Sequence, residues 1–375
     1  MTPSARRKTA LFCLATAIFT VAFVVFLYVQ PRSDLNTHLG YAQRIHSFSD
    51  ITSPHFLFEI LVKIPIAIGL TPVMACGLLL GGCYGGMAVL IAREIERRGI
   101  ALTTLRTFLI VPAVLIASHI FLFTVARQNL YYGYFVPVVY HNPTQQLGKL
   151  FGLWVWFRFC RQFVEPQSAT AWTRVSLTGA LCILSALAKP SFLIAFLPVG
   201  ACVAFVDLLQ GRRRRTLQFA VGIALPSAAV LLWQGRMAYG AGLASEVIFA
   251  PFAVFDPWQT VYKLPASLAF PLVIVAMAWR AHAWHPRLGW TGLFLAIALF
   301  QTLFLAEAGN VGAGNFAWTG QTAVFLTYVE SALFLLGRPW PARWRYAGWS
   351  VFAVHAACGV IWYAAGFFPE RGSFL

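Results

Sequence analysis

The chain has 375 residues, of which 59% are hydrophobic and 11% are charged, and its mean hydropathy is +0.71. Soluble domains carry about 25% charged residues, so this composition excludes a soluble protein and predicts a polytopic membrane protein. The net charge of +16 would suggest a nucleic-acid partner in a soluble chain. Here the excess lies in short loops where it orients the chain and meets anionic lipid, so we expect no nucleic-acid partner.

The apolar segments predict an all-α fold, a transmembrane bundle of about 11 helices with the N-terminus inside and the C-terminus outside. The expected spans are 9–30, 66–92, 107–126, 146–160, 175–188, 190–208, 216–234, 264–280, 289–306, 318–337 and 346–367. A cleaved signal peptide is the alternative interpretation of the first span. This segment is too long for a typical signal sequence, however, and lacks a small-residue cleavage site. We interpret residues 1–368 as one integral-membrane domain and residues 369–375 as a short disordered tail.

The stretch from Val175 to Leu208 decides the topology. It has 34 residues, which is too many for one helix across a bilayer of about 30 Å. Lys189-Pro190-Ser191 lies near its middle, so we expect one helix before this point and a second, returning helix after it. A single long kinked helix is the alternative, and it would invert every later segment. The span 146–160 is also short for a membrane crossing.

Basic residues occupy every second gap between the expected spans. Nineteen of the 28 fall in six short stretches, which the positive-inside rule assigns to the cytoplasmic side. These stretches are 6–8, 93–106, 158–174, 212–215, 280–287 and 338–345. The other loops then face outward, and they hold most of the Asp, Glu, His and Asn residues that could do chemistry.

The first outward-facing segment, residues 31–65, has polar residues at helical spacing. They are Asp34, His38 and Tyr41, followed by His55 and Glu59. Ser33 before Asp34 resembles a helix start, so we expect two short interfacial helices lying on the bilayer. The other outward segments are 127–149, 235–263 and 307–318, and the second of these has an apolar stretch, IFAPFAVFDPW, suited to dipping into lipid.

The polar residues of the outward face form a constellation rather than a motif. The sequence contains no P-loop, no GxSxG motif, no HExxH motif and no other metal-binding pattern such as paired cysteines. The outer face offers the acids Asp34, Asp50, Glu59, Glu246, Asp256 and Glu307, and the basic residues His38, Arg44, His55, Arg127, His141, Lys149 and Lys189. Such a mixture at a membrane surface could bind an anionic head group and deprotonate a hydroxyl.

Asp34 comes four residues after the expected exit of the first helix. A general base could be held there, and the structural alternative is a helix-capping aspartate. His38 lies one helical turn later and could orient Asp34 or share its proton, whereas the alternative is a surface histidine.

Lys189 lies among apolar residues at the expected helix break. Its charge is costly to desolvate unless it is paired, so it could contact a phosphate beside the backbone amides that Pro190 leaves open. Snorkelling to the outer interface is the alternative. Further along the outer face, Asn142 before a proline predicts a capped helix, whose N-terminus could form an anion site with His141 and Lys149.

Glu307 ends the ninth expected span and begins the glycine-rich segment EAGNVGAGNFAW, which includes Asn315. Glycines allow a backbone to approach a ligand closely, and a plain turn is the alternative. Glu330 lies inside the tenth expected span, where pairing with a nearby arginine is the simple interpretation.

Four blocks of the sequence resemble the GT-C class of integral-membrane glycosyltransferases. They are SDLNTHLGYAQRI with SPHFLFEIL, then YYGYFVPVVYHNPTQQLGKLF, ALAKPSFLIAFLP and EAGNVGAGNFAW. In layout the resemblance covers about the whole chain, since GT-C enzymes share many spans and a first extracytoplasmic loop with an acidic catalytic residue and amphipathic helices. Many of them carry two adjacent acids in that loop, whereas this chain has the single Asp34 with His38. This departure leaves a divalent cation open as a cofactor.

The resemblance implies a multi-pass enzyme of the bacterial inner membrane with an extracytoplasmic active face. It would move a sugar from a polyprenyl-phosphate donor to a glycan or lipid acceptor of the cell envelope, with Asp34 as general base and His38 beside it. The substrate- and phosphate-binding residues would be Arg127, His141, Lys149, Lys189, Glu307 and Asn315. The alternatives are a transporter or flippase of a lipid-linked sugar or other anionic substrate, with a discontinuous helix at the break, and a non-catalytic scaffold.

The charge pattern predicts the side on which each loop is labelled. In a cysteine-free background, single cysteines at Asp50, His141, Glu246 and Asn310 should react with a membrane-impermeant thiol reagent applied from outside. A cysteine at Arg213 should react only after permeabilisation, because its loop carries four consecutive arginines. Labelling of position 213 from outside would contradict both the topology and the helix break at Lys189.

Overall fold

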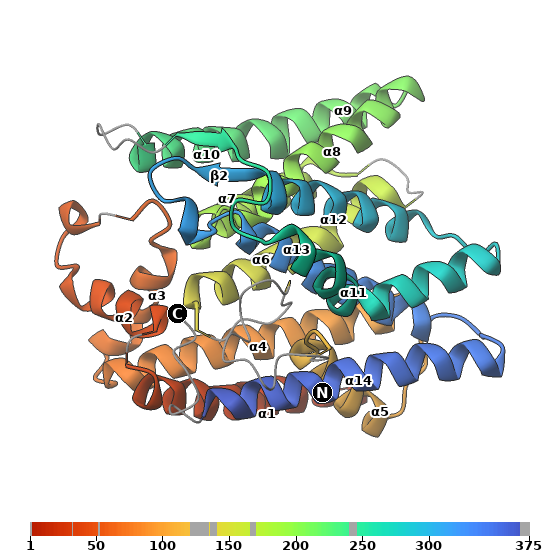
Figure 1. The fold of residues 1–375 in the computed structure, drawn as a ribbon, viewed down its shortest axis with the longest axis horizontal. Helices are drawn as coiled ribbons and strands as arrows, with labels where there is room; N and C mark the ends of the chain where they lie inside the picture. The colour runs from red at the N-terminus through yellow and green to blue at the C-terminus, as the bar shows by residue number, and fades with distance from the viewer. Residues whose placement is uncertain are drawn as a thin grey trace.

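The computed structural model describes residues 2–31, 33–51, 53–120, 135, 141–165, 170–239 and 246–367. The chain forms a bundle of α-helices with one short two-stranded ribbon (Figure 1). The all-α bundle predicted from the sequence is therefore confirmed. The expected tail, 369–375, lies outside the described residues, as does Arg127.

The helices occupy most of the described chain. In order they are α1 (Pro3–Val29), α2 (Asp34–Arg44), α3 (Leu57–Ala67), α4 (Pro72–Arg97), α5 (Thr104–Ile116), α6 (Pro143–Phe159), α7 (Trp172–Ala188), α8 (Ser191–Leu209), α9 (Arg213–Phe219), α10 (Leu225–Tyr239), α11 (Pro257–Arg280), α12 (Pro286–Phe304), α13 (Ala317–Leu336) and α14 (Ala342–Gly366). Short π-helical segments follow α6 (Cys160–Val164) and join α9 to α10 (Ala220–Ala224), and 3-10 turns lie at Phe48–Asp50 and Val311–Ala313. Strands β1 (Val247–Phe249) and β2 (Leu305–Glu307) pair antiparallel, with Val247 opposite Glu307.

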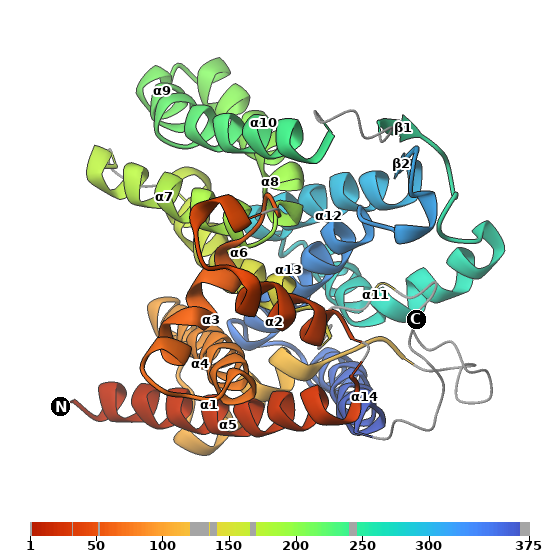
Figure 2. The same ribbon diagram turned by 90° about the vertical axis from the view of Figure 1, so that its left-hand side faces the viewer.

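Seven helices of the described chain are long and apolar enough to cross a membrane. They are Pro3–Val29, Pro72–Arg97, Ser191–Leu209, Arg213–Tyr239, Pro257–Arg280, Pro286–Phe304 and Ala342–Ala364. Helices α5 and α7 are shorter but also apolar. Helices α6 and α13 lie in the middle of the bundle and bury most of their residues (Figure 2). These helices indicate a membrane-embedded protein.

The basic stretches gather at one end of the bundle. The turns between α8 and α9, α11 and α12, and α13 and α14 lie at the right in Figure 1, opposite α2 and α3. Ion pairs join them there: Arg7–Glu96 (3.0 Å), Lys8–Glu96 (2.7 Å), Arg97–Glu165 (2.9 Å), Arg98–Glu330 (2.7 Å), Arg287–Glu94 (2.7 Å) and Arg212–Asp207 (3.2 Å). The pairing expected for Glu330 is confirmed. We refer to this end as the basic end.

The chain reverses between α7 and α8, as the sequence predicted. Helix α7 ends at Ala188, and Lys189 has extended backbone angles (φ −165°, ψ 130°). Along α6, Gly148 lies against Lys189, Gly152 against the ring of Phe192, and the rings of Phe159 and Phe196 are 5.0 Å apart. Helix α8 therefore runs parallel to α6. The Thr178 hydroxyl of α7 donates to Gln162 at the basic end, which shows that α7 runs antiparallel to α6. Two separate helices replace the single kinked one.

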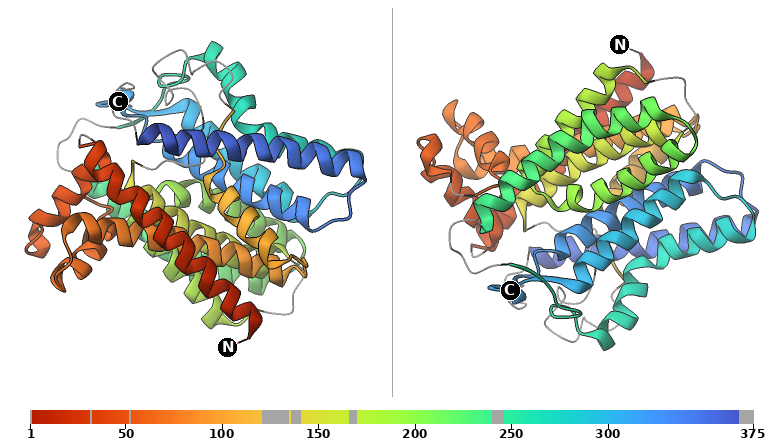
Figure 3. Two further views of the ribbon diagram at one scale, coloured as in Figure 1. Left: turned by 90° about the horizontal axis from the view of Figure 1, so that it is seen from below. Right: turned by 90° about the horizontal axis from the view of Figure 1, so that it is seen from above.

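Small residues bring α1 and α4 together at backbone distance. Gly77, Gly81 and Gly85 form a stripe on α4, and β-carbons there would overlap α1. A β-carbon on Gly81 would lie 2.5 Å from the carbonyl oxygen of Thr16, and one on Gly85 would lie 2.3 Å from the Thr16 hydroxyl. Close packing of this kind associates helices in lipid, where burying apolar surface gives little driving force. Figure 3 shows α1 crossing beside the α4 helix on one face of the bundle.

The helix expected at 107–126 ends early. Helix α5 stops at Ile116, and the four residues after it are not helical. The Ser118 amide donates to the carbonyl oxygen of His355 (3.0 Å), and the Ile120 amide donates to that of Ala266 (3.1 Å). The prediction of a helix over 117–120 was therefore wrong, because backbone in a membrane bundle can leave the helix where neighbouring helices satisfy its polar groups.

His355 of α14 completes this connection and is fully buried. Its Nδ1 donates to the carbonyl oxygen of Ser118 (2.6 Å), and its Nε2 accepts from the Phe270 amide (3.2 Å). The Tyr328 hydroxyl lies 2.7 Å from the same Nδ1 and donates to the carbonyl oxygen of Ser267 (2.7 Å). The neutral tautomer with its proton on Nδ1 fits these contacts, with that proton shared between the Ser118 carbonyl oxygen and the Tyr328 hydroxyl oxygen. The histidine thus joins α11, α13 and α14 to the chain after α5.

Replacing His355 by leucine should destabilise the bundle. The change leaves the Phe270 amide and the Ser118 carbonyl without their imidazole partner in a buried site, at a cost of about 1–3 kcal/mol for each group. Thermal unfolding of the purified protein in detergent, followed by loss of the monodisperse gel-filtration peak, measures the effect. The neighbouring change Val354→Leu is the matched control, because Val354 is 46% exposed. Equal midpoints for the two variants would contradict the bridging role.

Candidate functional site

A cavity of about 460 Å³ opens at the end of the bundle that carries α2 and α3. Its wall combines the loop before α3, the break between α7 and α8, the end of α10, and the segment from β2 to α13. The residues lining it include Pro54, His55, Lys189, Pro190, Ser191, Gln234, Tyr239, Val247, Glu307, Asn315 and Trp318. The sequence placed His55, Lys189, Glu307 and Asn315 on one face, and here they share one cavity.

Lys189 is held in the cavity wall by the helix break. Its amide donates to the carbonyl oxygen of Ser185 (2.8 Å) and ends α7, while Pro190, which has no N–H, precedes α8. The side-chain amine lies 4.1 Å from the ring centroid of Trp318, within cation–π range, and the residue is only 9% exposed. The amine is therefore directed into the protein rather than out to the interface, in contrast to the snorkelling alternative.

Burial lowers the pKa of Lys189 to about 7, and the negative charges of Asp34 and Glu59 oppose the shift. In the described residues no carboxylate lies within 4.0 Å of this amine. A buried cation without a direct counterion is poised to take an anionic group.

Asn142 links Lys189 to Asp34. Its Oδ1 caps α6 by accepting from the Gln145 amide (3.0 Å), and it also accepts from the Lys189 amine (3.2 Å). Its Nδ2 donates to a carboxylate oxygen of Asp34 (2.9 Å). The orientation of the amide is fixed by these contacts, so one side chain connects the amine and the acid. Asp34 is the first residue of α2 after Ser33, which confirms the predicted helix start.

The same capping contact takes one of the first-turn amides of α6. Pro143 has no amide hydrogen, and Asn142 already accepts from the first-turn amide of Gln145. Lys149 lies deeper in α6, 2% exposed, with its amine 5.5 Å from the ring centroid of Phe325. The anion site expected from the helix N-terminus, His141 and Lys149 stays a prediction, and capping and burial leave less of it open to a ligand.

His141 lies beside the cavity wall, with its ring 5.9 Å from that of Trp318. Burial lowers the pKa of His141 to about 4, although Asp34 opposes the shift. At neutral pH this imidazole is uncharged, so it would act toward a ligand as a neutral hydrogen-bonding group.

His38 pairs with Glu59 rather than with Asp34. Its Nδ1 donates to Glu59 Oε1 at 2.6 Å, and Glu59 of α3 is 1% exposed. The ring of His55 lies 6.4 Å from that of His38, and burial, Lys189 and His38 lower the pKa of His55 to about 3. A buried carboxylate that fixes one nitrogen of a histidine leaves the other nitrogen as a proton acceptor. Sequence reasoning missed this pair, because α2 and α3 had to be docked before His38 and Glu59 could meet.

Glu307 and Asn315 form the opposite wall of the cavity. Glu307 Oε1 accepts from the Tyr239 hydroxyl (2.8 Å), and Oε2 accepts from the Asn315 amide (2.7 Å). Strand pairing with β1 holds the backbone of Glu307. Both carboxylate oxygens are thus occupied, which suits a positioning role better than proton transfer.

No family model, no curated protein and no solved structure matches this chain. Within the ranges that the structure describes, no three His, Cys, Asp or Glu side chains are grouped so that they could hold a metal ion.

Lys189 should be acylated by an amine-reactive reagent at near-neutral pH. Below its pKa of about 7 the amine is protonated and unreactive, and above that pH it is a neutral nucleophile. Its labelling rate should level off just above neutrality, whereas a free peptide with the sequence ALAKPSF should continue to gain rate toward a lysine pKa of about 10.4. Mass spectrometry of peptides labelled at stepped pH values measures both rates. Parallel pH profiles would contradict the assignment.

Proposed function

We propose that the protein is a membrane glycosyltransferase of GT-C type, which transfers a sugar from a polyprenyl-phosphate donor to an extracytoplasmic glycan or lipid acceptor. The observation that carries the proposal is the hydrogen-bonded linkage from Lys189, which lines the cavity, through Asn142 to Asp34. It brings a group for an anionic donor and a group for an acceptor hydroxyl into contact with the same asparagine.

Lys189 would hold the phosphate of the donor. A phosphate in the cavity would favour the charged amine, and the charge would stabilise the negative charge that grows on the leaving phosphate. The lipid tail of the donor would run into the bilayer past β1, where Val247 lines the cavity at 50% exposure and Phe249 is 67% exposed. The neutral imidazole of His141 would contribute a hydrogen bond without adding charge.

Asp34 would act on the acceptor. The acceptor oxygen attacks the anomeric carbon, the bond from that carbon to the phosphate oxygen breaks, and polyprenyl phosphate leaves with the electron pair. The proton of the acceptor hydroxyl passes to Asp34. Among the described residues Asp34 has one hydrogen-bond partner, Asn142, whereas both oxygens of Glu307 are occupied, so Asp34 is the better base of the two. His38, oriented by Glu59, is the second group able to take this proton.

The membrane placement follows the charge distribution. We propose that the basic end faces the cytoplasm of a bacterial inner membrane and that the cavity opens on the extracytoplasmic side. In this arrangement the chain crosses the membrane eleven times, with α2 and α3 lying in the outer interfacial layer.

A transporter or flippase is supported less well by the same features. Transporters of that kind place a broken helix and its charges near the middle of the bilayer. Here the break at Lys189 separates two antiparallel helices at the end of the bundle, and the polar residues around it belong to that end.

The change Asp34→Asn should lower sugar transfer by roughly 10²–10⁴-fold, the usual contribution of a general base, while donor binding changes little. The assay is transfer from radiolabelled polyprenyl-phosphate sugars into membranes, with protein levels matched by blot. The control Glu246→Gln removes an exposed carboxylate from the same end of the bundle. Normal turnover by Asp34→Asn would remove Asp34 from the mechanism, and the same assay on His38→Gln would then test the second candidate.

The change Lys189→Ala is the complementary arm of this experiment. It should weaken donor binding first, because it removes the cation at a dry site. Arg44→Ala removes an exposed cation from α2 and should leave donor binding unchanged. Donor affinity that survives Lys189→Ala would contradict the phosphate assignment.

A further inference from the structure

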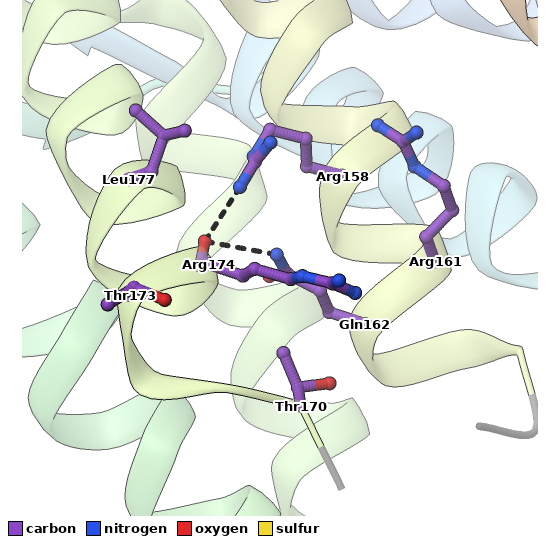
Figure 4. A pocket seen from close by; sticks show the side chains of 7 residues that line it. All are labelled: Arg158, Arg161, Gln162, Thr170, Thr173, Arg174 and Leu177. Carbon is purple, nitrogen blue, oxygen red and sulfur yellow. Dashed lines mark hydrogen bonds between the residues drawn. The ribbon is translucent and has the colours of Figure 1, made fainter. Parts of the chain in front are cut away.

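A second cavity, of about 420 Å³, lies at the basic end, far along the bundle from the first. The π-helical end of α6 and the beginning of α7 form its walls (Figure 4). It is lined by Arg158, Arg161, Gln162, Thr170, Thr173, Arg174 and Leu177. Three guanidinium groups in one small cavity and no acidic residue in its lining make this an anion-attracting site.

Hydrogen bonds hold the arginines in place. Arg158 donates to the Thr178 hydroxyl (3.0 Å) and to the carbonyl oxygen of Arg174 (2.8 Å), which Gln162 also contacts (3.1 Å). Two of these bonds are the dashed lines in Figure 4. Arg161 donates to the carbonyl oxygen of Phe157 (3.0 Å). A guanidinium has five N–H donors, so donors remain on each of these arginines after those bonds are made.

The neighbouring acids are committed elsewhere. Glu165 pairs with Arg97 and Arg287, and Glu94 pairs with Arg97, Arg98 and Arg287. Across the described ranges, Arg158, Arg161 and Arg174 make no ion pair with a carboxylate. Arg97, Arg98 and Arg287 at the same end each have an acidic partner. The three arginines of the cavity instead repel one another. An anion from outside the chain would relieve this repulsion.

The beginning of α7 adds donors without charge. Its N-cap residue is Ala171, and no side chain caps the helix. The Arg174 amide donates to the Ala171 carbonyl oxygen (3.0 Å), and within the described residues the Trp172 and Thr173 amides are left for another acceptor. The hydroxyls of Thr170 and Thr173 border the same cavity. Guanidinium groups, hydroxyls and helix amides together match the oxygens of a phosphate group.

Exposed apolar side chains of α7 lie beside the cavity. Leu177, one turn further along α7, is 47% exposed, and Trp172 at the start of the helix is 40% exposed. Leucines are also exposed on the neighbouring helical span formed by α9 and α10, where Leu217 is 54% and Leu225 is 64% exposed. Tryptophan at a helix end is typical of the membrane interface, and apolar residues beside it would contact acyl chains.

We propose that this cavity binds the phosphate of an anionic phospholipid, whose acyl chains lie against α7. The phosphodiester would neutralise Arg158, Arg161 and Arg174 together, and would tie the end of α6 to the start of α7. The proposal requires only that the chain is embedded in a membrane, so it is independent of the reaction proposed at the other end.

The test is lipid binding by the delipidated full chain, measured by native mass spectrometry. Phosphatidylglycerol should be retained more tightly than phosphatidylcholine with the same acyl chains, because only the former has a net negative charge. In the double variant Arg161→Gln/Arg174→Gln, phosphatidylglycerol affinity should fall by about tenfold or more. Equal retention of the two lipids by the unaltered protein would overturn the proposal without any variant.

The controls separate this site from general charge and from free phosphate. Arg214→Gln removes an exposed arginine that lies outside the cavity, and it should leave phosphatidylglycerol affinity unchanged. Because Arg174 is exposed, Arg174→Gln alone should fold normally and still weaken binding, as judged beside a monodisperse gel-filtration profile. An equal loss with Arg214→Gln would overturn the proposal. Displacement of the lipid by millimolar inorganic phosphate would overturn the assignment to a lipid headgroup.

Discussion

The reversal of the chain at Lys189 and Pro190 determines much of the rest of the structure. The 34 residues from Val175 to Leu208 are nearly all apolar and would extend well beyond a bilayer of about 30 Å as one helix. Two antiparallel helices each match the thickness of the hydrocarbon core. Proline at the turn between them has no backbone N–H that would be left without a partner. Because of this reversal, residues 212–215 reach the basic end, and an amine is left at the opposite end where the chain turns.

Local rules predicted the parts of the fold that depend on neighbouring residues. The pairs Ser33-Asp34 and Asn142-Pro143 marked helix starts, and the helix break followed from length and proline. Partners distant in sequence could not be inferred in this way. The end of α5 depends on His355, more than 200 residues later, and the partner of His38 depends on how α3 docks.

The candidate site shows the same division. Sequence reasoning collected Lys189, Glu307 and Asn315, because polar residues between apolar spans must share a face, and the structure assigns them to one cavity. It also included Lys149, which the helical twist of α6 directs into the core toward α13. Its reading of Asn142 as a cap was right but incomplete, since the same side chain also joins the lysine to the aspartate. A single sequence gives a residue's depth in the membrane more readily than its direction around a helix.

The glycine stripe of α4 has a consequence for the cell in which the protein works. Bilayers change thickness with temperature and acyl-chain composition, and isolated spans respond by tilting. The backbones of α1 and α4 are in contact, so these two helices cannot tilt independently. The segment that connects them, α2 and α3, is therefore anchored at both ends to a rigid helix pair. The spacing between Asp34 and Lys189 is then set by protein contacts rather than by the lipid surface. The geometry of the cavity should persist when the membrane around it becomes thinner or thicker.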